Sequence, residues 1–251
     1  MSWTKSSNKG CDVDEDLIAK YPELERRHFW WATRRRLVME MYRSWFPGGG
    51  ARILDVGCGS GVTVDSLARA GADVVGVDLE VSTADSPGRR IVSGDYLELS
   101  QGLGEFDLVM ALDVVEHFED DSRVLKTIAG NTRNGGRVLI TVPAFQWLWS
   151  SHDEHNNHYR RYTRSTLTAA MTAAGLDVQR SGYLFLGLLL PKWAITVLER
   201  ISREPGSTGT DVGALNGIAS VYFRLETALA MRLYNFLPLG TSVVAVATTA
   251  R

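Results

Sequence analysis

The sequence predicts an α/β domain built on a mainly parallel sheet that helices cover on both faces. Three observations predict this fold. Short apolar runs of strand length alternate with amphipathic runs of helix length over residues 51–183. The apolar runs are nearly continuous, which is typical of parallel strands buried on both faces. A glycine-rich turn, Gly57-x-Gly59-x-Gly61, joins the first strand to an amphipathic helix start.

The elements follow one another in a regular order along the chain. Residues 14–46 have a helical pattern, which we interpret as an N-terminal helical cap that ends at Pro47-Gly-Gly-Gly50. Strands are predicted at 51–56, 72–78, 90–95, 106–112, 137–142, 176–183 and 242–249. A helical insert, 187–238, precedes the last strand. We therefore expect one domain, 1–251, with a ligand-binding core at 51–183.

The composition is that of an ordinary globular protein. The chain has 251 residues, of which 45% are hydrophobic and 22% are charged, and its net charge is −2. No basic field is present, so we expect no nucleic-acid partner. Two cysteines and an acidic N-terminus without an apolar core favour a cytoplasmic location. The most apolar run, 183–198, is interrupted by Pro191 and Lys192, so we expect no membrane span.

Acidic residues lie at or just after the ends of four predicted strands: Asp55, Asp78, Asp95 and Asp113. Ligands of such sheets bind at the carboxyl ends of the strands. The glycine turn brings backbone N–H groups close to a ligand, and Asp78 can accept hydrogen bonds from both hydroxyls of a ribose. The glycine spacing differs from the dinucleotide pattern, which has two residues before its third glycine, and this argues against NAD.

Together these motifs resemble the class I S-adenosylmethionine-dependent methyltransferases. The resemblance rests on Leu54-Asp-Val-Gly-Cys-Gly-Ser-Gly61, Gly76-Val-Asp78, Gly94-Asp95, the stretch 106–117 and the stretch 134–143. It implies a Rossmann-like seven-stranded sheet of order 3-2-1-4-5-7-6 with strand 7 antiparallel. It implies S-adenosylmethionine as cofactor, S-adenosylhomocysteine as product, and a cofactor site that includes Asp55, Gly57, Cys58, Gly59, Gly61, Asp78, Leu79, Gly94, Asp95, Tyr96, Leu112 and His117.

A second resemblance concerns the acceptor. The stretches Trp147-Leu-Trp-Ser-Ser-His-Asp153 and Tyr159-Arg-Arg-Tyr-Thr163 look like a bacterial subgroup of this family, many of whose members act on secondary metabolites or on cell-surface glycans and lipids. The candidate bases are His117, His152, His155 and His158, with Tyr159 as a polar partner. For His117, the alternative to a role at the cofactor is a structural role at the start of a helix. A metal site formed by the last three histidines is disfavoured, because they lie on a predicted loop without cysteine, and we expect no metal.

Five side chains are candidates for the acceptor site: His28, Trp31, Trp147, Trp149 and Arg160. The alternative for the first two is an amphipathic helix that packs its aromatic residues on the core and leaves Arg34-Arg-Arg36 in solvent. The alternative for Arg160 and Arg161 is ion pairing with Asp153 and Glu154. The aromatic flanks favour an apolar or aromatic small-molecule acceptor, with oxygen ahead of nitrogen or carbon as the methylated atom.

Three roles besides core packing remain open for the insert 187–238: a lid, a homodimer interface, or a peripheral membrane contact. Two other functions also stay open. One is an NAD-dependent oxidoreductase on the same sheet, and the other is a non-catalytic S-adenosylmethionine-binding module.

Overall fold

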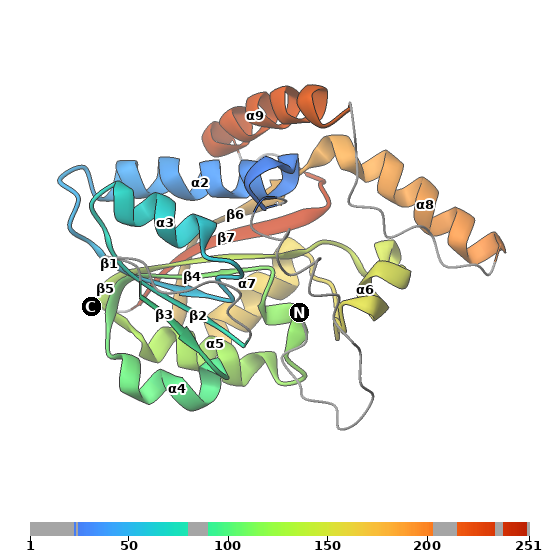
Figure 1. Ribbon diagram of the computed structural model, residues 1–251. Coiled ribbons are helices and arrows are strands. Elements are labelled where there is room, and N and C mark those ends of the chain that lie inside the picture. Colours follow the sequence, from blue (N-terminus) through green and yellow to red (C-terminus); the bar gives the residue numbers. More distant parts are fainter. Residues whose placement is uncertain (1–22, 24, 80–89, 203–214, 234–237, 250–251) are drawn as a thin grey trace.

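A seven-stranded sheet of order β3-β2-β1-β4-β5-β7-β6 forms the centre of the computed structural model (Figure 1). The structure describes residues 23, 25–79, 90–202, 215–233 and 238–249. Strands β1 to β5 pair in parallel, and β7 is antiparallel to both β5 and β6. The predicted order and the predicted antiparallel strand are confirmed. The predicted cap before residue 23 and parts of the insert, 203–214 and 234–237, lie outside the described residues.

The bounds of the elements are as follows. The strands are β1 (Arg52–Val56), β2 (Asp73–Asp78), β3 (Arg90–Ser93), β4 (Phe106–Leu112), β5 (Thr132–Pro143), β6 (Leu176–Leu184) and β7 (Ser242–Thr249). The α-helices are α2 (Phe29–Trp45), α3 (Val62–Arg69), α4 (Tyr96–Leu103), α5 (Asp121–Gly130), α6 (Ser151–His155), α7 (Arg164–Ala173), α8 (Leu189–Ser202) and α9 (Leu215–Leu233). Short 3-10 turns are η1 (Val115–His117), η2 (Gln146–Leu148) and η3 (Leu186–Leu188).

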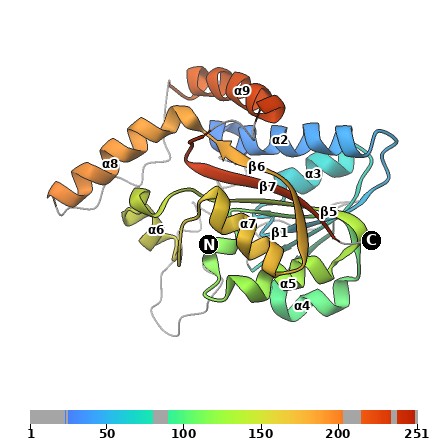
Figure 2. The ribbon, with the colours of Figure 1, turned by 180° about the vertical axis from the view of Figure 1, so that it is seen from behind.

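Helices cover both faces of the sheet, α2, α3 and α9 on one side and α4, α5 and α7 on the other (Figures 1 and 2). Strand β4 shows why its sequence is apolar from Leu108 to Leu112. Leu108 and Met110 pack with residues of α2 and α3, whereas Val109 and Ala111 pack with residues of α4, α5 and α7. Successive side chains of a strand point to opposite faces, so a strand covered twice needs apolar residues at every position.

Two local differences from the predicted elements have clear causes. The turn Asn134-Gly-Gly136 was expected before the fifth strand, but β5 already begins at Thr132, which pairs with Phe106. A register shift between Phe106 and Leu108 absorbs the extra residues as a bulge. The segment that contains His152 and His155 was expected to be a loop, yet it forms α6. Its start is stabilised by the Asp153 carboxylate, which accepts the Ser150 N–H at 3.0 Å.

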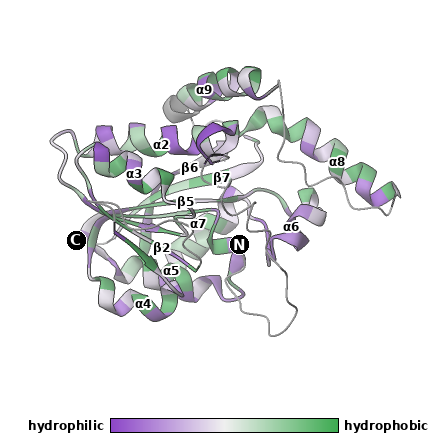
Figure 3. Cartoon of the chain, in the orientation of Figure 1, coloured by the Kyte–Doolittle hydropathy of each residue, from purple (hydrophilic) through white to green (hydrophobic). Residues whose placement is uncertain are grey.

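The insert consists of α8 and α9, and the two helices differ in their contacts. Helix α9 packs on α2, where Phe223 stacks on Phe29 with ring centroids 5.1 Å apart. Helix α8 projects from the body of the domain in both ribbon views (Figures 1 and 2). Green, apolar stretches alternate with purple ones along both helices in Figure 3. The exposed large hydrophobic side chains are Leu190, Trp193, Ile195, Leu198 and Ile201 on α8, and Ile218, Val221, Tyr222, Leu225 and Leu229 on α9. Within the described residues, no helix has both the length and the apolar character that crossing a membrane requires.

Candidate active site

The glycine turn lies between β1 and α3 at the carboxyl edge of the sheet. Gly57, Gly59 and Gly61 have φ angles of +71°, +57° and +79°, which side chains with a Cβ rarely adopt. The Gly57 N–H donates to the Val77 carbonyl at 2.7 Å and so ties the turn to β2. A Cβ at Gly76 would lie 2.7 Å from the Cys58 Sγ, so Cys58 packs tightly against β2. The turn is therefore a tightly held stretch of backbone, and the Glu25 carboxylate lies against it at Gly59.

Asp78 joins the end of β2 to this turn. Its carboxylate is buried, and its Oδ2 accepts the Gly59 N–H at 2.8 Å. The sequence predicted an acid at this strand end, and the structure places it directly beside the glycine backbone. An acidic group next to glycine backbone suits a ligand with hydroxyl donors.

Asp55, at the carboxyl end of β1, is almost completely buried. Burial raises the pKa of Asp55 to about 7, and the nearby Glu25 and Asp78 act in the same direction, while Arg34 opposes them. The carboxyl group thus changes its charge close to neutral pH. It is suited to a cationic ligand group, which would stabilise the ionised form.

Two side chains that the sequence analysis did not place at the site come from the cap. The Glu25 carboxylate accepts a hydrogen bond from the Ser60 hydroxyl in the glycine turn. Arg34 donates to the Leu112 carbonyl and forms an ion pair with Asp113, with Nη1 and Oδ2 2.7 Å apart. The interpretation of Arg34 as a solvated arginine is therefore wrong. The spacing of apolar residues in the sequence could have indicated this position. Leu37 and Val38 follow Arg34 by three and four residues, so they share its helix face, and both are buried.

The residues predicted to border adenine follow β3. Asp95 caps α4, where its Oδ1 accepts the Leu97 N–H at 2.8 Å. The Gly94 N–H donates to the Asp78 carbonyl at 2.9 Å, which holds this segment against the end of β2. The Tyr96 side chain lies in the core, and its hydroxyl donates to the Asn131 side chain at 2.9 Å. Adenine contacts therefore stay a prediction for this segment, and Tyr96 can make one only through its backbone.

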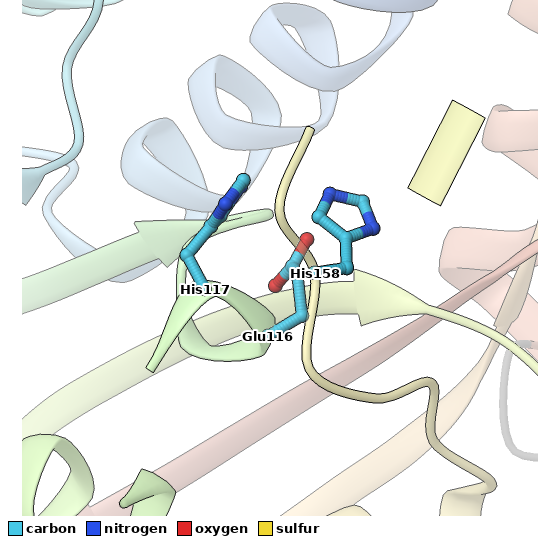
Figure 4. Close-up of side chains that lie close together, drawn as sticks. All are labelled: Glu116, His117 and His158. Atoms are coloured by element: carbon cyan, nitrogen blue, oxygen red, sulfur yellow. The ribbon is translucent and has the colours of Figure 1, made fainter. Parts of the chain in front are cut away.

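A buried cluster of Glu116, His117 and His158 lies just after β4. Figure 4 shows the Glu116 carboxylate between the two imidazole rings, whose centroids are 4.6 Å apart. Glu116 and His117 belong to η1, and the loop that carries His158 is held there because the Tyr159 N–H donates to the Glu116 carbonyl at 2.8 Å. Burial lowers the pKa of His117 to about 3, and the neighbouring His158 adds to this shift. Burial, together with Asp113, raises the pKa of Glu116 well above its ordinary value.

Asp153 and Arg161 hold His158 in place. The His158 Nδ1 lies 2.9 Å from the Asp153 Oδ1, and the Arg161 guanidinium binds both oxygens of the same carboxylate at 2.8 and 2.9 Å. Burial alone would raise the pKa of Asp153, but the hydrogen bond to His158 and the Arg161 charge hold it well below its usual range. The ion pair between Arg161 and Asp153 agrees with the ion-pair interpretation of the sequence. Because Asp153 is held by Arg161 and binds the Nδ1 of His158, Nε2 is the nitrogen of His158 that is left for the cluster.

His152 and His155 lie on α6 and are exposed. The His152 ring centroid is 6.4 Å from that of His158, and neither His152 nor His155 belongs to the buried cluster. The sequence grouped His152, His155 and His158 by their spacing, whereas the fold groups His158 with His117. The reason is the α6 turn, which orients the first two histidines differently from the loop residue that follows it.

The aromatic residues of the cap are partly committed to local packing. The His28 side chain caps α2, where its Nδ1 accepts the Trp30 N–H at 3.2 Å. The half-buried Trp31 ring lies edge-on to the His28 ring, with centroids 5.1 Å apart. An acceptor contact by either side chain stays a prediction.

The other candidate acceptor residues lie near α6. Trp147 is 44% exposed and stacks on Phe145, while Trp149 is half-buried at the end of η2. Arg160 forms an ion pair with Asp121 at 3.1 Å, rather than with the acids expected from the sequence. The two tryptophans thus offer apolar surface at this edge, whereas the guanidinium of Arg160 already has a partner.

A hollow of about 550 Å³ lies elsewhere, between α7 and β6. Its lining includes Arg164, Thr168 and Gln179, and it contains none of the predicted cofactor or acceptor residues. The carboxyl edge of the sheet is a better candidate for the active site than this hollow, because the buried acidic residues and histidines lie there.

Comparison with known proteins identifies the family. Residues 23–181 match the family model described as a methyltransferase domain. This chain belongs to the class I S-adenosylmethionine-dependent methyltransferases. The methyltransferase is similar to the ubiquinone biosynthesis O-methyltransferase of Azorhizobium caulinodans, with 34% identity over 177 residues, 61% of this chain and 69% of that protein. It is also similar to the enzyme of the same name from Ralstonia nicotianae, with 27% identity over 218 residues, 74% of this chain and 91% of that protein.

A solved structure agrees with the fold of this methyltransferase. Phosphoethanolamine N-methyltransferase 2 of Haemonchus contortus, in complex with S-adenosyl-L-methionine, has a TM-score of 0.60 at 16% identity and covers 96% of this chain and 58% of that one. At this identity the likeness concerns the fold alone. The family membership decides in favour of methyl transfer over the two other functions that the sequence left open. The methyl donor is S-adenosylmethionine.

Proposed function

We propose that this methyltransferase moves a methyl group from S-adenosylmethionine to a hydroxyl group of an apolar or aromatic small molecule. The observation that carries the proposal is the position of the buried cluster Glu116, His117 and His158 next to exposed aromatic surface. Tyr159, 40% exposed, directly follows His158, and Trp147 is exposed on the neighbouring η2 turn. Polar groups beside aromatic surface suit an acceptor with an apolar body and one polar reacting group.

The proposed cofactor site uses the edge above β1 and β2. Asp55 and the glycine turn would border the methionine part, and Asp78 would accept hydrogen bonds from the ribose hydroxyls. Gly94 and Asp95 would border the adenine. These assignments are supported by the glycine turn and by the buried acids at the strand ends. When bound, S-adenosylmethionine supplies a methyl group on a positively charged sulfur.

The acceptor oxygen attacks the methyl carbon in line with the departing sulfur, so the chain must orient the acceptor and help to remove its proton. His117 is a poor base at neutral pH, because burial lowers its pKa to about 3. His158 is better oriented, since Asp153 holds its Nδ1 and leaves Nε2 directed toward the cluster (Figure 4). Of the predicted catalytic residues, His158 therefore carries the strongest geometric support.

Oxygen is the proposed methylated atom because the curated relatives named above are O-methyltransferases. A secondary metabolite or a glycan or lipid precursor fits the apolar surface of α8 and η2. Homodimer formation, peripheral membrane contact through α8 and α9, and a cytoplasmic location remain part of the proposal. Sedimentation velocity and vesicle flotation of the full chain test the first two.

An acceptor screen tests the proposed function. The full chain is incubated with S-adenosylmethionine labelled on its methyl group, and with matched sets of hydroxylated aromatic compounds, apolar alcohols and small polar acceptors. Transfer to the apolar or aromatic hydroxyl compounds supports the proposal. Transfer to small polar acceptors only would contradict it.

A further inference from the structure

We propose that Glu116, His117 and His158 bind one divalent transition-metal ion beside the methyl-transfer site. The sequence analysis predicted no metal, because it considered His152, His155 and His158, which the fold separates. The structure instead brings together one carboxylate and two imidazoles, whose ligand atoms all lie within 4.8 Å of one another. Ligand atoms on opposite sides of such an ion are about 4 Å apart, so small side-chain rotations complete the site.

Three of the atoms that would bind the ion lack hydrogen-bond partners in the described part of the chain. These atoms are the two carboxylate oxygens of Glu116 and the Nδ1 of His117. All three are buried, and none of them has a hydrogen-bond partner among the described residues. A buried polar atom left without a partner destabilises the fold. A cation between these atoms would satisfy all three. Asp113 lies nearby but is not available, because Arg34 and the Thr141 hydroxyl already bind its carboxylate.

The surrounding contacts are those that orient histidine ligands. The Asp153 carboxylate holds the Nδ1 of His158, so Nε2 is the nitrogen of this ring that is left to bind an ion. Histidine ligands of metals typically donate their second nitrogen to a carboxylate or a carbonyl in this way. The Nδ1 of His117 has no hydrogen-bond partner among the described residues and can accept an ion. The His158 ring is therefore fixed before an ion arrives.

The donor set selects the kind of ion. Two imidazole nitrogens and one carboxylate oxygen suit Zn²⁺, Mn²⁺, Fe²⁺ or Co²⁺, whereas Ca²⁺ and Mg²⁺ prefer all-oxygen sites. Three protein ligands leave at least one coordination position open, which is the pattern of catalytic metal sites. The net charge of one carboxylate and a divalent ion is +1, so the open position favours an oxygen anion.

The role of the ion rests on the proposed function. Coordination of the acceptor hydroxyl to the open position lowers the pKa of that hydroxyl, and its proton leaves to solvent. The oxygen then forms a bond to the methyl carbon while the carbon–sulfur bond breaks and its electron pair stays on sulfur. The products are the methyl ether, S-adenosylhomocysteine and one proton. With the ion bound, the Nε2 of His158 is a ligand and no longer a base. The ion therefore takes over activation of the hydroxyl from His158, and His117 cannot supply a base either.

Manganese binding tests the site without any acceptor. The full chain is treated with a chelator, dialysed, and titrated with Mn²⁺ while free Mn²⁺ is followed by electron paramagnetic resonance. We expect saturation at one ion per chain. We expect Glu116→Gln and His158→Gln to weaken binding 100-fold or more, and Asp153→Asn to weaken it about 10–100-fold.

His155→Gln is the matched control, because it removes an exposed imidazole from the same segment and should leave Mn²⁺ affinity unchanged. Calorimetry with S-adenosylhomocysteine on each variant shows that its fold is intact and tests the cofactor site separately. Absence of saturable Mn²⁺ binding, or equal affinity in Glu116→Gln and His155→Gln, would overturn the metal site even if S-adenosylhomocysteine binds. Mn²⁺ binding without S-adenosylhomocysteine binding would instead contradict the function and leave the metal site standing.

Discussion

The two halves of the carboxyl edge are built in different ways. Above β1 and β2, the site centres on one continuous turn, whose geometry comes from glycine backbone with φ angles between +57° and +79° and to which Asp78 is added from the end of β2. Above β4 and β5, the site consists of side chains from four separate segments: α2, η1, α6 and the loop that contains His158. The first half is dominated by a motif that is continuous in sequence, whereas the second exists only after these segments have packed together.

Under the proposed function, this difference separates the sites for the enzyme's two substrates. A donor shared across a family can be bound by a short backbone motif, which tolerates few changes because its φ angles require glycine. The acceptor side depends on distant side chains, so it can change without changing the donor site. The ion pair between Arg161 and Asp153 is the main fixed point of that second half.

Among changes in the β4–β5 half, replacement of Arg161 should lower the stability of the protein most. The side chains of Arg161 and Asp153 are 4% and 0% exposed, so Arg161→Met leaves a buried carboxylate without its charged partner. We expect the free energy of unfolding to fall by about 3–5 kcal/mol. Urea denaturation followed by circular dichroism measures it.

The matched control is Arg160→Met. Its ion pair with Asp121 is more exposed, with side chains 29% and 26% accessible, so its loss should cost about 0–1 kcal/mol. Equal losses for the two variants would show that Asp153 is not the fixed point of this half.

Asp78→Ala should have the largest effect on the β1–β2 half. It removes the proposed ribose acceptor and also the acceptor of the Gly59 N–H. Hydrogen bonds to a charged group are worth about 1.5–3 kcal/mol, so we expect S-adenosylhomocysteine to bind about 10–150-fold more weakly. Calorimetry measures the affinity, and Mn²⁺ binding should be unaffected. Unchanged cofactor affinity in a folded variant would remove Asp78 from the ribose site.

The pH dependence of cofactor affinity should be smaller, and it should come from Asp55. Its pKa of about 7 means that the carboxyl group is mostly neutral at pH 6 and mostly ionised at pH 7.5. The cationic amino group of the cofactor requires the ionised form, so affinity should rise roughly tenfold between these two pH values. In Asp55→Asn the affinity should be lower and nearly independent of pH over this range. A flat profile in the unaltered protein would argue against a contact between Asp55 and the amino group.

The same division explains how much the sequence could predict. The glycine turn and the alternation of strands and helices follow from local patterns, and both were predicted. The strand order was implied by the family resemblance that these motifs carry, and it too was confirmed. The roles of Glu25 and Arg34 were missed, because their partners Ser60 and Asp113 are distant in sequence and meet them only in the fold.

The histidines show the same limit. His152, His155 and His158 looked alike in sequence, but their environments differ once the Ser150 and Asp153 contact starts α6. On α9, Ile218, Tyr222 and Leu225 lie at helical spacing but are all exposed, whereas Phe223 makes the contact with α2. The spacing of apolar residues predicted the helix. It could not predict which face of the helix packs on the domain, because that depends on the position of α2.

The smallest effect should come from His155. This side chain is exposed on α6, outside the buried cluster, and substitutions at such positions usually change stability by no more than about 0.5 kcal/mol. We therefore expect His155→Ala to keep both the free energy of unfolding and the Mn²⁺ affinity of the unaltered protein. His158→Ala, three residues further along the chain, removes the partner of a buried carboxylate and should lower both quantities. Urea denaturation and Mn²⁺ titration measure the two quantities. Similar results for the two variants would mean that the difference in burial between these histidines has no effect. The contrast between the two halves would then depend on Arg161 alone.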